Sequence, residues 1–163
     1  MTAEGLMGTA QWIQLGTAVV ALLALGASLC NMARSRVKQI EDDYVRRYWQ
    51  TLDLLPSDAL VNRRPRKTSD EARRAARLYL RLSEDEMELR AMGWVGKHTW
   101  AEWSSGIRAQ LRQWPIDVEW ERITNGDLKA GTRDQFMELK KLDSNPSHDP
   151  CKRHFFVRKW RGL

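Results

Sequence analysis

The most distinctive pattern in the chain is a long apolar stretch near its start. No Asp, Glu, Lys or Arg occurs from Gly5 to Cys30, and the densest apolar part runs from Ile13 to Leu29. A helix rises about 1.5 Å per residue, so about 20 apolar residues cross the hydrocarbon core of a bilayer. Trp12 stands at one edge, where membrane helices often carry an interfacial aromatic residue. The pattern predicts a transmembrane helix within residues 1–33.

Two other structures also place an apolar helix near an N-terminus. A buried helix of a soluble protein needs apolar partners on all sides, and the remainder of the chain is too charged to supply them easily. A cleaved signal peptide is the closer competitor, because small residues such as Gly26 and Ser28 occur near the apolar end. Secretory signals normally begin with cations, whereas residues 1–12 contain Glu4 and no Lys or Arg. The membrane helix is therefore the favoured prediction.

Helical spacing continues beyond the apolar stretch. Apolar positions recur at steps of three and four as far as Leu52, which predicts a helix that continues through a juxtamembrane segment, residues 34–53. Pro56 ends the pattern, and residues 54–68 have the prolines and cations of an exposed linker. A capping box of Thr68 and Glu71 predicts the start of the next helix.

The helix that follows this capping box has an apolar face and a charged face. Its predicted core positions are Ala72, Ala75, Ala76, Tyr79, Leu80, Ser83, Met87 and Met92, and Gly93 predicts its end. The opposite face carries the acidic run Glu84, Asp85, Glu86 and Glu88, with Arg81 and Arg90 at the i,i+4 positions of Asp85 and Glu86. We expect a solvated, salt-bridged face here, because the Glu-x-x-His pairs of di-iron bundles are missing.

An aromatic stripe marks the next helix, over residues 99–114. Its members follow one another at steps of 3, 4, 4 and 3: Trp100, Trp103, Ile107, Leu111 and Trp114. An aromatic stripe at helical period usually buries, so helix packing is favoured over an aromatic cage or a base-stacking platform. After Pro115, a shorter element reaches the Asn125-Gly126 turn, and a last helix is predicted from Thr132 to Leu142.

These elements define the predicted organisation of the chain. No stretch has the sustained period-two alternation of a sheet, so the predicted fold class is all-α. One transmembrane helix is followed by a small helical domain over residues 69–143, and residues 144–163 form a tail. At 163 residues the chain has room for one modest domain.

The distribution of charge predicts the orientation. All 27 Lys and Arg lie at or after Arg34, and Arg34, Arg36 and Lys38 directly follow the apolar stretch. The positive-inside rule places the helical domain in the cytoplasm and the N-terminus outside the cell membrane. Cys30 and Cys151 then lie in a reducing compartment or at the membrane edge, and no structural disulfide is expected.

The tail combines cations with aromatic residues and contains no acid after Asp149. These residues are Lys152, Arg153, Phe155, Phe156, Arg158, Lys159, Trp160 and Arg161. Near an anionic leaflet each cation contributes about 1 kcal/mol, and aromatic rings insert at the interface. Nucleic acid is the alternative partner, with the cations on phosphates and the rings on bases. A solubilising tail without a partner is the third interpretation.

No motif in the chain indicates catalysis. A glycine-rich phosphate loop, a G-x-S-x-G elbow and a nucleophile beside a base are all missing from the sequence. His148, Cys151 and His154 have the spacing H-x2-C-x2-H, with His98 as a conceivable fourth ligand, but this spacing matches no standard zinc module. We therefore expect no enzyme, no cofactor and no metal.

Residues 78–111 carry a resemblance to a known group of proteins. The positions involved are Tyr79, Leu80, Glu84, Gly93, Trp100, Trp103 and Gly106. Together with the N-terminal anchor, this segment resembles small single-pass bacterial membrane proteins of a domain-of-unknown-function family. The resemblance implies an anchor followed by two packed helices and implies no activity.

These observations together predict a function class. The chain is expected to be a membrane-anchored cytoplasmic helical interaction or scaffold module whose basic-aromatic tail contacts the anionic inner leaflet. Its expected partner is the lipid bilayer, with a protein partner or a second copy of the chain as further candidates. The alternative is a membrane-tethered nucleic-acid-binding protein.

Overall fold

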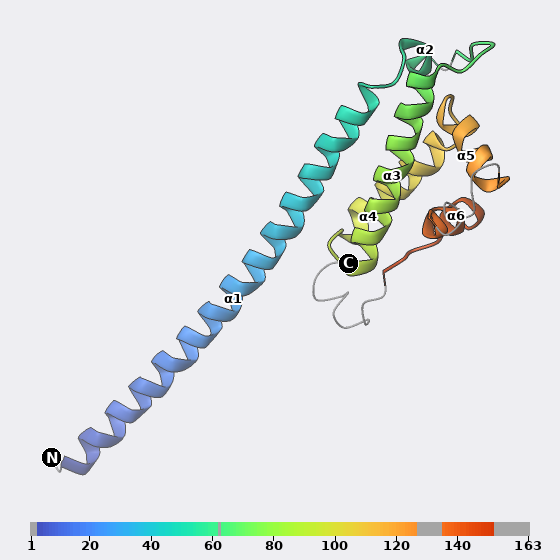
Figure 1. The fold of residues 1–163 in the computed structure, drawn as a ribbon. Helices are drawn as coiled ribbons and strands as arrows, with labels where there is room; N and C mark the ends of the chain where they lie inside the picture. Colours follow the sequence, from blue (N-terminus) through green and yellow to red (C-terminus); the bar gives the residue numbers. More distant parts are fainter. Residues whose placement is uncertain (1–2, 62, 127–134, 152–163) are drawn as a thin grey trace. The chain divides into compact units, whose positions relative to one another are not determined.

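The fold is entirely helical over the residues that the structure describes. The computed structural model describes residues 3–61, 63–126 and 135–151, with side chains from residue 11 onward. Its helices are α1 (Ala3–Leu52), α2 (Ser57–Leu60), α3 (Asp70–Met92), α4 (Lys97–Gln110), α5 (Ile116–Thr124) and α6 (Met137–Ser144) (Figure 1). The predicted all-α fold class is thereby confirmed. Contacts within the chain divide it into two compact units, with the boundary between Lys38 and Gln39.

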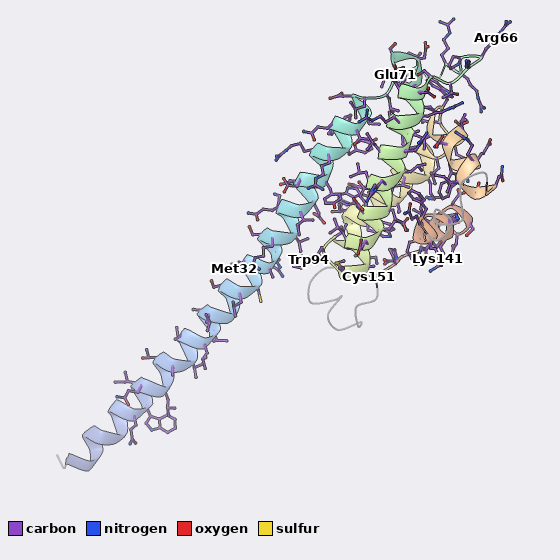
Figure 2. All side chains as sticks on the ribbon, in the orientation of Figure 1. Met32, Arg66, Glu71, Trp94, Lys141 and Cys151 are labelled. Atoms are coloured by element: carbon purple, nitrogen blue, oxygen red, sulfur yellow. The ribbon has the colours of Figure 1, made fainter. Side chains whose placement is uncertain are left out.

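The first unit consists of α1 up to Lys38 and contains the apolar part of this helix. Its large side chains are exposed, Trp12 at 76% and Leu23 at 69%, and Met32, which Figure 2 labels, is exposed as well. Among the described residues, one helix is long and apolar enough to cross a membrane: the range Gln11–Leu52 contains an 18-residue window of mean hydropathy 2.0 with no buried residue. The helix continues without a break to Leu52, as its spacing predicts.

The second unit has its own hydrophobic core, centred on α3. This helix packs against α5 and α6, and α4 packs against α6 (Figure 1). The core contains Ala76, Tyr79, Leu80, Met87, Val95, Trp100, Ile107, Leu111, Ile116, Trp120, Ile123, Phe136, Leu139 and Leu142. Tyr48 and Leu52 of α1 pack against this cluster. The last turns of α1 therefore contribute to the helical core.

The start of α3 differs by one residue from the predicted capping box. The N-cap is Ser69, whose Oγ accepts a hydrogen bond from the backbone N–H of Ala72 at 3.1 Å. Thr68 instead accepts a hydrogen bond from the Trp114 indole N–H at 3.3 Å. The Thr68 hydroxyl, which was predicted to cap α3, thus takes part in a tertiary contact instead. At the other end, Gly93 adopts φ 75°, a left-handed conformation that glycine reaches without strain, and the predicted end is confirmed.

The charged face of α3 is only partly solvated, which corrects the sequence-based interpretation. Glu86 and Arg90 are buried, and Arg90 pairs with Asp149 instead of Glu86. Glu84 is half-buried and accepts a hydrogen bond from the backbone N–H of Leu139 at 3.3 Å. Residues after α6 and in the other helices cover these positions, because the unit packs around α3 on more than one side. Met92, predicted as a core position, is 43% exposed.

Two smaller features also differ from the sequence prediction. The segment 54–68 contains the one-turn helix α2, with Ala59 buried, although the four cations from Arg63 to Lys67 are exposed as expected. Phe136 adopts φ 71° just before α6, so this helix begins at Met137; the predicted start at Thr132 lies outside the described residues. The Phe136 ring is buried edge-on against Trp120, with the ring centroids 6.4 Å apart.

Candidate functional site

A pocket of about 240 Å³ lies among α1, α3 and α4 in the second unit. Its lining residues are Val45, Tyr48 and Trp49 of α1, Tyr79 and Glu86 of α3, and Glu102, Trp103, Gly106 and Ile107 of α4. Four of these described lining residues are aromatic, two are acidic and none is basic. The walls of the pocket are thus mainly apolar and aromatic, and the two charged residues among the described lining are the glutamates.

Aromatic contacts hold the walls of the pocket in place. The Tyr48 ring lies edge-on to Tyr79, with centroids 6.2 Å apart, and edge-on to Trp49 at 5.4 Å. Trp103 lies against the ring of Tyr44, with centroids 6.2 Å apart. Such offset and edge-to-face pairs contribute about 0.5–1.5 kcal/mol each beyond the area that they bury. They connect α1 to both α3 and α4.

A hydrogen bond fixes the beginning of α4 next to α1. The N-cap of α4 is Gly96, which has no side chain to satisfy the free N–H groups of the first turn. Glu41 of α1 accepts a hydrogen bond from the Gly96 backbone N–H at 2.8 Å. A carboxylate is also favourable at the positive end of a helix. This contact positions α4, and with it Trp103, relative to the aromatic residues of α1.

Glu86 is the chemically unusual member of the lining. Its exposed fraction is 5%, and among the described residues it has no hydrogen bond or ion pair. Burial raises the pKa of its carboxyl group from 4.5 to about 8, and the nearby charge of Asp85 adds to this increase. Burial also raises the pKa of Tyr79, which lies close by on α3. At neutral pH the pocket therefore contains a largely protonated carboxyl group.

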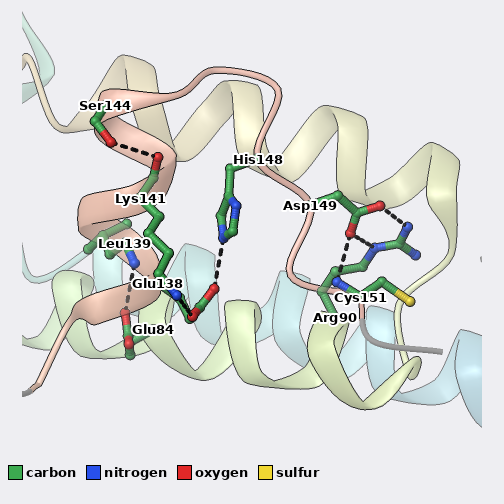
Figure 3. Close-up of polar contacts among 9 residues, drawn as sticks. All are labelled: Glu84, Arg90, Glu138, Leu139, Lys141, Ser144, His148, Asp149 and Cys151. Atoms are coloured by element: carbon green, nitrogen blue, oxygen red, sulfur yellow. Dashed lines mark hydrogen bonds and ion pairs between the residues drawn. The ribbon is translucent and has the colours of Figure 1, made fainter.

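Arg90, one turn after Glu86, is occupied by other partners. Its Nε and Nη2 donate to the two carboxylate oxygens of Asp149 at 2.9 and 2.7 Å (Figure 3). Its Nη1 donates to the carbonyl oxygen of Val95 at 2.7 Å. This two-point pairing of a guanidinium with a carboxylate is the strong form of an ion pair. The side chain of Arg90 is fully buried, and it ties the segment after α6 to the end of α3.

A second polar cluster surrounds Glu138 of α6 (Figure 3). Its carboxylate accepts a hydrogen bond from Lys141 and lies 2.7 Å from His148 Nε2; mainly the Lys141 contact lowers the pKa of Glu138. The backbone N–H of Cys151 donates to Asp149.

The residues weighed as zinc ligands in the sequence are His148, Cys151 and His154, with His98. His148 faces the Glu138 carboxylate, and His154 lies outside the described residues. Across residues 11–61, 63–126 and 135–151, no group of three or more potential metal ligands is found.

Most residues of the predicted packing stripe are buried in the core, and one of them is only partly buried and lines the pocket. Trp100, Ile107, Leu111 and Trp114 are buried, with Leu111 and Trp114 beyond the end of α4. Trp103 is only partly buried, and it packs on the core with one part and lines the pocket with another. Its position differs because the pocket opens at this point between α4 and α1.

The predicted membrane-contacting or nucleic-acid-contacting residues fall into two groups. Arg34, Arg36 and Lys38 are exposed on α1 at the end of the first unit. The predicted contact residues of the tail, from Lys152 to Arg161, lie outside the described residues. The structure therefore places the first group and leaves the second as a prediction from sequence.

Glu86 is a site residue that was not predicted from the sequence, although its spacing carries a signal. Tyr79, Ser83, Glu86 and Arg90 follow one another at steps of four, three and four, and all four are buried. Glu86 therefore lies on the core row of the helix and not opposite to it. An acidic residue on a core row indicates either a buried ion pair or a binding site.

Comparison with known proteins identifies no relative. No protein-family model matches the chain, and neither a curated protein nor a solved structure matches it. The resemblance of residues 78–111 stays a prediction.

Proposed function

We propose that the chain is a single-pass membrane protein with a cytoplasmic helical binding module. The observation that carries the proposal is the two-part character of α1. Within the first unit this helix is apolar and exposed, and its last turns contribute to the hydrophobic core of the second unit. Exposed Arg34, Arg36 and Lys38 follow the apolar part, and the positive-inside rule assigns this side to the cytoplasm. A binding role is favoured because the helical unit offers a pocket lined by Glu86, a buried acid with no ion pair in the part of the chain that the structure describes.

The second element of the proposal is the tail, whose support comes from the sequence. Five cations and three aromatic residues follow Cys151 without an acid. For a protein held at a bilayer, the anionic inner leaflet is the nearest large anion. We assign lipid as the partner of the tail, and nucleic acid becomes the outcome that a competition experiment would detect.

The first prediction concerns orientation. In a Cys30→Ser variant, Cys151 is the remaining thiol, and it is half-exposed. A membrane-impermeant maleimide should leave this variant unlabelled in intact cells and label it after permeabilisation, because the helical unit lies inside. Gel-shift detection of a polyethylene-glycol maleimide measures the result, and the Cys30→Ser, Cys151→Ser double variant gives the background.

Two outcomes would contradict this topology. Labelling of Cys151 in intact cells would reverse the orientation. An intact mass that lacks the N-terminal apolar residues would identify a cleaved signal peptide in place of an anchor.

The second prediction concerns the tail. The fragment of residues 39–163 omits the cations beside the apolar helix. It should bind vesicles in which about one lipid in three is phosphatidylserine more tightly than neutral vesicles, because the tail cations are attracted to anionic headgroups. Replacing Phe155, Phe156 and Trp160 by Ala should lower the affinity at unchanged charge, because ring insertion adds to Coulomb attraction. Vesicle co-sedimentation measures both effects.

Salt weakens binding to lipid and to nucleic acid alike, so a competition must separate them. At equal anion concentration, single-stranded RNA should leave the fragment on anionic vesicles. Release of the fragment into the RNA-bound fraction would overturn the lipid assignment in favour of nucleic acid.

A further inference from the structure

The pocket combines the two features that recognise organic cations in proteins. Its walls present the rings of Tyr48, Trp49, Tyr79 and Trp103, and its charged lining residues are Glu86 and Glu102. A cation within about 6 Å of an aromatic ring centroid gains about 0.5–2 kcal/mol from the ring, with the larger values where water is excluded. An anionic ligand would meet carboxylates, and none of the described lining residues is basic to offset them.

Glu86 supplies the second and independent argument. Buried carboxylates in proteins are paired with a cation or hydrogen-bonded, because an isolated buried charge is strongly unfavourable. Glu86 lines the pocket and has neither kind of partner among the described residues, while Arg90 donates its hydrogen bonds to Asp149 and to the Val95 carbonyl oxygen. A ligand with a positive charge would complete this incomplete site.

We propose that the pocket binds a small organic ammonium ion, with Glu86 as its counter-ion and the rings of Tyr48, Trp49 and Trp103 as its walls. All of these residues belong to the second unit. Glu102 contributes a further negative charge at the mouth, where it is exposed and lies 3.4 Å from His98.

The size and the ligand set favour a small organic ion over a metal ion. The volume of about 240 Å³ is below the 300–1,000 Å³ typical of drug-sized ligand sites, so the ligand is small. Hard metal cations take about six or more oxygen ligands. Within the described part of the chain no three metal-ligating side chains come together, whereas aromatic walls match the apolar surface of an alkylammonium ion.

Protonation of Glu86 couples binding to pH. The neighbouring titratable groups are Tyr44 and Tyr48 on α1, Asp85 and Tyr79 on α3, and Glu102 on α4. Burial raises the pKa of the three tyrosines, which therefore keep their protons between pH 7 and 9. An ammonium ion pairs with the ionised carboxylate, so its binding expels the proton of Glu86. With a pKa of about 8, affinity should rise about tenfold from pH 7 to pH 9.

The experiment uses the full chain in a maltoside detergent, which carries no ammonium group. The probe is choline, whose trimethylammonium group stays charged at every pH used, and the control ligand is 3,3-dimethyl-1-butanol, which has the same shape without the charge. Saturation-transfer NMR of the methyl signals should show choline binding that rises with pH. The alcohol should bind at least about tenfold more weakly.

Two variants of the same kind test the role of Glu86. Glu86→Gln should lower choline affinity at pH 9 by at least about tenfold and abolish the pH dependence, because the amide cannot ionise. Glu88→Gln removes the same charge from an exposed position of α3 outside the pocket lining, and it should bind as the wild type does. Circular dichroism confirms that each variant is folded.

Several results would overturn the inference. These are the absence of a choline signal from the wild type at pH 9, equal affinities for choline and the neutral alcohol, or full choline binding by Glu86→Gln. Equal losses in Glu86→Gln and Glu88→Gln would show diffuse attraction by the acidic helix in place of a site.

Discussion

Replacing Glu86 by Gln is expected to stabilise the helical unit, and the gain should increase with pH. The carboxyl group has a pKa of about 8 in the folded protein and 4.5 as its reference, because burial disfavours the charged form. Between these two values the folded state binds more protons than the unfolded state, so wild-type stability falls as pH rises. At 1.36 kcal/mol per pKa unit, the full loss approaches roughly 5 kcal/mol above pH 8.

The variant removes this loss, since Gln resembles the protonated acid in shape and does not ionise. Urea unfolding of the 39–163 fragment should give nearly equal stabilities for wild type and Glu86→Gln at pH 4, and a difference of roughly 3 kcal/mol at pH 7. The exposed Glu88→Gln substitution should change stability by about 0.5 kcal/mol or less at both pH values. If the free energies of unfolding of the wild type and of Glu86→Gln changed with pH in parallel, Glu86 would be ionised in the folded protein.

Such a result would also bear on function. A buried acid that lowers the stability of the fold at neutral pH is not explained by packing. Groups of this kind concentrate at binding and catalytic sites. Choline at saturating concentration should therefore stabilise the wild type at pH 9, because a ligand that binds only the folded state shifts the equilibrium toward it.

Replacing Arg90 by Ala is expected to destabilise the helical unit by about 3–5 kcal/mol, the usual cost of breaking a buried ion pair by removing one partner. The substitution removes the two hydrogen bonds to Asp149 and the one to the Val95 carbonyl oxygen, and it leaves space in the core. Urea unfolding of the same fragment provides the measurement.

Arg112→Ala is the matched control for this prediction. Arg112 also pairs with an aspartate, Asp143 at 2.6 Å, but its side chain is 66% exposed. Exposed pairs contribute about 0–1 kcal/mol, because water and salt screen the charges. Equal costs for the two substitutions would mean that the Arg90 pair does not hold the fold. A clear difference would establish that it attaches the segment ending at Cys151 to α3.

Local patterns in the sequence were sufficient for the helical framework. The end of α1 at Leu52, the end of α3 just before Gly93 and the buried positions of α3 up to Met87 follow from spacing, proline and glycine signals. These signals act over a few residues, because helix periodicity and caps depend on neighbours three or four positions apart. The basic-aromatic tail is likewise a property of the sequence, and its partner stays a prediction.

The candidate site, by contrast, depends on contacts that local patterns do not encode. Arg90 meets Asp149, which is 59 positions away, and Glu41 meets Gly96 at a separation of 55. The sequence by itself determined the long helices, the apolar segment and the row of positions that includes Glu86. Only the tertiary structure decided that Glu86 is buried with no hydrogen bond or ion pair among the described residues, since the burial of a charge depends on which distant side chains pack around it.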